Sequence, residues 1–176
     1  MVNPSETAVW ATALATLIVV AITCYQVRLS RLALGVDLLL KLEGQFNSSM
    51  MRDTRMKAAK ALKDGEESAE LDEILGFFET LGLLVHRGAV NEELVWNSFS
   101  SWVLPYAALA QDYIKSKRKA DSDGTYWMEL DHLTKQLKHT EKKKRKLKTL
   151  PTISNKSLEE FLEIEANLIQ PGHHND

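Results

Sequence analysis

The sequence predicts an all-α protein in which an N-terminal transmembrane helix continues into a small helical bundle. Residues 8–27 contain no charged side chain. Behind them, apolar residues recur every three or four positions, which is the period of an amphipathic helix. No useful length of the chain alternates between apolar and polar residues as a strand does, and Gly 8 and Pro 4 in 176 residues are too few for a turn-rich β protein.

Residues 8–27 predict the membrane span. As a helix, this stretch covers ~30 Å, the thickness of a hydrocarbon core. Trp10 and Tyr25 lie near its ends, where aromatic side chains favour the membrane interface. A cleaved signal would need a basic start, and the first 27 residues contain no Lys or Arg. A lipoprotein signal would use Cys24, but Thr23 precedes it where a smaller residue is usual. A buried core helix remains an alternative.

Charge around the span predicts its orientation. Arg28, Arg31 and Lys41 follow it, and Glu6 is the one charged side chain before it. The positive-inside rule then places the N-terminus outside and the body in the cytoplasm. We therefore divide the chain into a stub and transmembrane helix (1–27), a cytoplasmic helical domain (28–140), and a basic segment with a short C-terminal helix (141–176).

The apolar spacing predicts the elements of the body in turn. One helix of ~40 residues includes the span, continues into the body and ends near residues 46–49. A basic helix over 51–63 follows, and then an apolar helix over 70–87 that Gly88 ends. Asn91 caps a helix that runs to Tyr113 and is kinked by Pro105. Further helices are expected over 125–149 and near 158–168.

Charge is segregated along the chain although the net charge is only −2. Residues 28–63 and 113–151 are basic, whereas residues 64–112 hold ten acidic side chains and one basic one. The run 142–148 is either a solvated helix end or, together with the two arginines after the span, a contact for anionic lipid. The candidate headgroup contacts are Arg28, Arg31, Lys142, Lys143, Lys144 and Arg145. No aromatic residues interleave with the run, which disfavours nucleic acid as a partner.

The common catalytic and ligand-binding motifs are absent from the sequence. It has no Gly-rich phosphate loop, no HExxH pattern and no nucleophile elbow. The single cysteine excludes an intrachain disulfide and multi-cysteine metal sites. His132 and His139 would lie ~10 Å apart on a helix, too far for one metal ion. We therefore expect no catalytic residue, no cofactor and no metal ligand.

Two weaker candidates remain. Glu79 and His86 lie seven residues apart on roughly one face of the apolar helix. They form either a carboxylate–imidazole pocket or an ordinary exposed face with a cation at the helix end. Trp96 belongs to an aromatic-rich region that is either core or, where exposed, a partner surface.

Several of these motifs resemble a family of uncharacterised bacterial proteins that is catalogued as a domain of unknown function. The resemblance rests on the FFE-x-L-G-x-L helix that begins at Phe77, the Arg-Gly stop at residues 87–88, the Glu-Glu-Leu start at residues 92–94, and the aromatic helix through Trp102. Residues 126–133 resemble a later helix of that family, with departures at Leu130 and His132. The resemblance spans roughly residues 8–135. It implies one N-terminal helix in a bacterial inner membrane and a small helical cytoplasmic domain, and it brings no known activity.

These patterns favour a membrane-anchored helical module that acts through protein contacts, as a homo-oligomer or with a protein partner, and without catalysis. One alternative is a membrane-proximal sensor or effector that binds a small ligand or anionic lipid. A helical enzyme with a Glu79/His86 pocket is the least favoured alternative.

Overall fold

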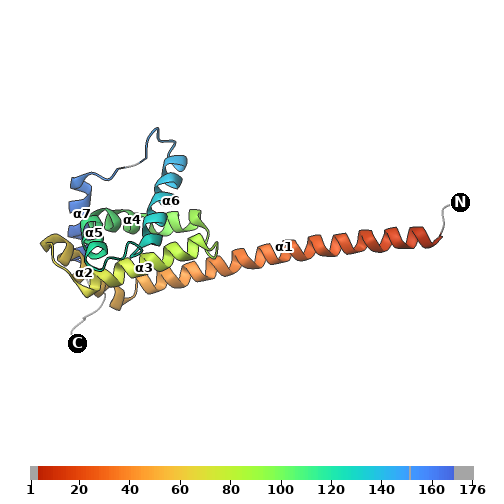
Figure 1. Ribbon diagram of the computed structural model, residues 1–176, viewed down its shortest axis with the longest axis horizontal. Helices are drawn as coiled ribbons and strands as arrows, with labels where there is room; N and C mark the ends of the chain where they lie inside the picture. Colours follow the sequence, from red (N-terminus) through yellow and green to blue (C-terminus); the bar gives the residue numbers. More distant parts are fainter. Residues whose placement is uncertain (1–3, 151, 169–176) are drawn as a thin grey trace, which may run out of the picture.

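The computed structural model describes residues 4–150 and 152–168, and every regular element within them is a helix. In chain order these are α1 (Pro4–Phe46), α2 (Ser49–Asp64), α3 (Ala69–His86), α4 (Glu92–Leu109), α5 (Gln111–Ala120), α6 (Met128–Lys144) and α7 (Asn155–Ala166). Figure 1 shows α1 as a long rod that projects from a bundle formed by the others. The predicted all-α architecture is confirmed.

Helix α1 is one continuous helix of 43 residues, and it ends at Phe46 as predicted. From Thr12 to Leu34 every residue is exposed, and the helix first becomes buried at Gly35. At that point a Cβ would lie 2.8 Å from the carbonyl oxygen of Ala89, so only glycine allows this approach of α1 to the loop between α3 and α4. Residues 12–34 are therefore not the core helix that the sequence left as an alternative.

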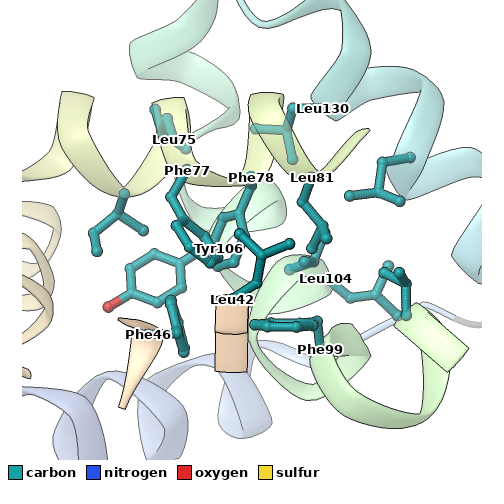
Figure 2. Packing of buried hydrophobic residues seen from close by; sticks show 14 of the residues in the cluster. Leu42, Phe46, Leu75, Phe77, Phe78, Leu81, Phe99, Leu104, Tyr106 and Leu130 are labelled. Atoms are coloured by element: carbon teal, nitrogen blue, oxygen red, sulfur yellow. The ribbon is translucent and has the colours of Figure 1, made fainter. Parts of the chain in front are cut away.

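The core surrounds α3, which packs against α2, α4 and α6. Aromatic rings from three helices meet in its centre (Figure 2). Phe46 lies 5.6 Å from both Phe78 and Phe99 by ring centroids, and Phe78 lies 5.8 Å from Tyr106. The end of α1 is thus anchored in the bundle through a fully buried ring.

A buried ion pair joins α7 to α2. Arg55 donates to both carboxylate oxygens of Glu165, at 2.8 and 2.5 Å, and both side chains are almost fully buried. The hydroxyl of Tyr106 donates to the same carboxylate at 3.1 Å, and the Arg55 guanidinium lies 4.4 Å from the centre of the Phe46 ring. Every charged group of the pair therefore has a polar or aromatic partner, which a buried charge requires.

Two predicted helices have wrong boundaries. The helix expected to run from Asn91 to Tyr113 passes through Pro105 but ends at Leu109, and α5 starts after Ala110. This break lets Tyr113 turn back to the bundle and donate to Asp72 at 2.6 Å. The helix expected over 125–149 runs only from Met128 to Lys144. Its delayed start follows from a cap that another helix supplies, as described below.

Candidate functional site

One face of α3 meets the first turn of α6. Glu79, Gly82 and His86 are spaced by three and four residues, which places them along one helix face. Gly82 is buried, and a Cβ there would lie 2.8 Å from the carbonyl carbon of Glu129. Because only glycine leaves room for this contact, the backbones of the two helices approach each other closely at the start of α6.

Glu79 caps α6 from across this contact. Its carboxylate accepts hydrogen bonds from the backbone N–H of Glu129 at 3.1 Å and of Leu130 at 2.7 Å. The residue at the N-cap position of α6, Trp127, has φ 52° and provides no side-chain cap. A helix start leaves N–H groups without intrahelical acceptors, and a negative charge near them is favourable. Glu79 therefore fixes where α6 begins.

His86, Glu129 and His132 form a cluster at this junction. Nδ1 of His86 lies 2.9 Å from each carboxylate oxygen of Glu129, and Nδ1 of His132 lies 3.6 Å from Oε2. The two imidazole rings are 6.0 Å apart by centroids and nearly perpendicular. The hydrogen bond from His86, and then His132, holds the pKa of the Glu129 carboxyl below its ordinary value. Two imidazoles from different helices thus converge on one carboxylate.

This cluster has the composition of a cation site. One potential ligand atom from each side chain lies within 4.8 Å of the others. The Glu129 side chain is 13% exposed, whereas those of His86 and His132 are 58% and 47% exposed. The carboxylate is therefore held inside while both imidazoles remain open to solvent and to an incoming ion.

Sequence reasoning missed this cluster. As a possible metal-ligand partner of His132, the prediction considers only His139. It leaves out Glu129, which lies three residues before His132 on the same helix face. A Glu-x-x-His spacing is a recognisable signal because residues three apart on a helix are neighbours. The contribution of His86, 43 residues earlier than Glu129, depends on the packing of α3 on α6 and has no local signal.

The two residues of the predicted polar pocket lie on the same face of α3. Both contact Glu129: the Glu79 carboxylate accepts a hydrogen bond from the backbone N–H of Glu129, and the His86 imidazole contacts the Glu129 carboxylate. The His86 imidazole is thus paired with the carboxylate of Glu129, whereas the carboxylate of Glu79 accepts hydrogen bonds from the backbone of α6.

Four of the six predicted lipid contacts line two neighbouring grooves. Arg28 and Arg31 line a groove of about 320 Å³ between α1 and the α3–α4 loop. Lys142 and Lys143 line a second groove, and Glu92 at the start of α4 borders both. Two of the predicted cations have acidic partners: Lys144 pairs with Glu93, and Arg145 pairs with Glu141 at 3.3 Å. The acidic start of α4 therefore lies between the two basic parts of the chain.

Trp96, the predicted partner surface, is half-buried on α4 and packs against the core. Its indole nitrogen is buried, and no residue in the described part of the chain forms a hydrogen bond with it.

The fold thus defines a helical protein with one stretch, Thr12–Phe46, that is long and apolar enough to cross a membrane by length and composition. Residues 10–137 match the DUF4760 family, a domain of unknown function, and the chain belongs to this family. The match includes α3, α4 and the whole His86–Glu129–His132 cluster. No curated protein and no solved structure matches the chain.

Proposed function

We propose that this protein is a single-pass membrane protein whose helical body acts through self-association, without catalysing a reaction. In this proposal residues 8–27 span the cytoplasmic membrane, with the N-terminus outside and the body in the cytoplasm. The observation that carries it is the exposed part of α1. Its large apolar side chains between Leu14 and Val27 are each about half exposed or more, and no other element of the bundle covers them. Apolar surface of this extent requires lipid or protein around it.

The same helix favours self-association beyond the span. Leu29, Ala33, Val36 and Leu40 are exposed and follow the four-three-four spacing of a coiled-coil seam. Around the helix axis they are centred about 120° from the buried residues of α1, which are Gly35, Leu39, Leu42 and Phe46. Membrane insertion gives all copies the same orientation, so two α1 helices would run parallel and bring identical residues together. This seam, formed by Leu29, Ala33, Val36 and Leu40, is therefore a suitable surface for a second copy.

Ultracentrifugation of the full chain tests the membrane anchor. We expect the protein to sediment with membranes after an alkaline wash and to dissolve only with detergent. Val19→Arg places a charge in the middle of the span and should move the protein to the supernatant or abolish its accumulation. Leu34→Arg is a control, because it adds the same charge at an exposed residue outside both the span and the seam. Recovery of the unchanged protein in the soluble fraction would remove the anchor from the proposal.

Disulfide crosslinking tests the seam. In a Cys24→Ser background, Val36→Cys should give an interchain disulfide in membranes under mild oxidation. Ser30→Cys, about 120° around the same helix, is the matched control and should stay monomeric. Equal crosslinking at both positions, or at neither, would contradict self-association through this seam.

A specific observation supports a second function, contact with anionic lipid. Arg28 and Arg31 line the groove where α1 leaves the predicted span, at the height of the headgroups. We expect the full chain in mixed micelles to retain phosphatidylglycerol over phosphatidylcholine in native mass spectrometry. Arg28→Gln with Arg31→Gln should abolish this preference, whereas Lys57→Gln with Lys60→Gln, an equal change of charge on α2, should preserve it. Equal loss in both variants would reduce the effect to net charge.

A further inference from the structure

We propose that His86, Glu129 and His132 bind a divalent transition-metal ion, with Zn²⁺ as the best-fitting ion. This inference goes beyond the proposed membrane anchoring and does not depend on it, since the three residues lie on α3 and α6 of the bundle.

The ligand chemistry favours Zn²⁺ over the alkaline-earth ions. Two imidazoles and one carboxylate form a ligand set that zinc uses when a fourth position is left for water. Magnesium and calcium prefer a shell of oxygen atoms, which this cluster does not supply. Imidazole also suits Co²⁺, which provides a spectroscopic probe of the same site.

The distances from the Glu129 carboxylate to the two imidazoles require little movement to accept an ion, and the three ligand atoms lie within 4.8 Å of one another. Ligand atoms about 2.0–2.2 Å from a tetrahedral zinc ion lie about 3.3–3.5 Å from one another. The His132 Nδ1 to Glu129 Oε2 distance is 3.6 Å, and the His86 Nδ1 to Oε2 distance is 2.9 Å. An ion therefore replaces the hydrogen bond of His86 if these two groups separate by roughly half an ångström, which rotation of the exposed imidazole allows.

The helices hold the inner ligand in place before an ion arrives. Glu129 is fixed by the two hydrogen bonds that Glu79 accepts from the first turn of α6, and by the close contact at Gly82. Glu129 and His132 are three residues apart on one helix, so their relative position is set by the helix itself. His86 completes the set from the last turn of α3. A simple ion pair would need one imidazole, whereas here two converge on the same carboxylate.

Metal titration of the full chain in detergent tests the site. The chain carries three other histidines and one cysteine. The protein is therefore prepared without an affinity tag, and with Cys24, His173 and His174 replaced by Ser or Ala. Calorimetry with Zn²⁺ should give one ion per chain, and Co²⁺ should give the absorption bands of a low-coordination nitrogen–oxygen site. Mg²⁺ and Ca²⁺ at the same concentrations should give no binding heat.

Single substitutions then locate the ion. His86→Ala, His132→Ala and Glu129→Gln should each weaken Zn²⁺ binding at least tenfold and abolish the Co²⁺ bands. His139→Ala is the matched control, because it removes an exposed imidazole two turns further along α6 and should leave the affinity unchanged. Circular dichroism of each variant checks that the helices persist.

Three results would overturn the inference. They are no saturable Zn²⁺ binding up to millimolar concentration, equal loss of binding in the His139 variant, and unchanged binding when His86 or His132 is replaced.

Discussion

Removal of Glu165 should destabilise the body more than any surface change, because it leaves the guanidinium of Arg55 buried without its counter-ion. The two side chains are 4% and 3% exposed, and Arg55 directs two donors to Glu165. Breaking a buried pair on one side costs about 3–5 kcal/mol. With a urea dependence of about 2 kcal/mol per molar, Glu165→Ala should lower the unfolding midpoint by about 2 M. The measurement is urea unfolding of the detergent-solubilised chain, followed by circular dichroism.

The same two helices provide the control. Lys63 and Glu163 also join α2 to α7, but their side chains are 52% and 58% exposed. Water screens such a pair, so Glu163→Ala should shift the midpoint far less. Replacing Arg55 and Glu165 together by methionine should recover most of the lost stability, because no charge then remains buried. Similar midpoints for the two single variants would refute the reasoning.

Three further changes probe the junction of α3 with its neighbours. Gly82→Ala should lower the urea unfolding midpoint, because the added Cβ forces α3 and α6 apart. Gly76→Ala is the control in the same helix: a Cβ there meets no atom within 4 Å, so the midpoint should stay the same or rise. Equal effects of the two substitutions would contradict the close contact. Glu79→Ala should destabilise the protein by about 1 kcal/mol through loss of the α6 cap, measured by the same unfolding curves, and no change would exclude a capping role. Burial, and then the hydrogen bond to Asp72, raises the pKa of the Tyr113 hydroxyl from 10.0 to about 12. The unfolded chain therefore loses this proton at lower pH than the folded chain. The free energy of unfolding should then fall as the pH rises from 10 towards 12. Unfolding curves across that range should show a smaller fall for Tyr113→Phe, and parallel curves would contradict the shift.

The parts of the fold that depend on neighbouring residues could be predicted from the sequence. The apolar run and its continuation to Phe46 define α1, because a helix period and the absence of a breaker are local properties. The end of α3 and the start of α4 followed from Gly88 and Asn91 for the same reason. Asn91 does accept hydrogen bonds from the backbone N–H of Glu93 and Leu94.

The features that join distant segments could not be predicted in this way. The cap of α6 comes from Glu79, about 50 residues earlier, so the sequence around Thr125 gives no sign of where the helix starts. Glu165 reads as one more acidic residue of a polar helix, and its partner Arg55 lies 110 residues away. Both residues carry charges that local patterns assign to the surface. Their roles depend on which helices pack together, a property that the period of one helix does not contain.

The proposed metal site and the proposed dimer seam share one structural element. His86 ends α3, and three residues later Ala89 forms the backbone contact with Gly35 of α1. An ion that holds His86 therefore also restrains the loop on which α1 rests. Comparing the oxidised Val36→Cys protein with the reduced protein, whose new thiol is blocked by alkylation so that it cannot bind Zn²⁺, tests whether the site and the seam are coupled. Equal Zn²⁺ affinity in both forms means that site and seam act independently. If instead the crosslink changes the Zn²⁺ affinity, the site and the seam share a coupling free energy. Zn²⁺ must then change the dimerisation constant of the reduced protein by the factor that this coupling free energy gives.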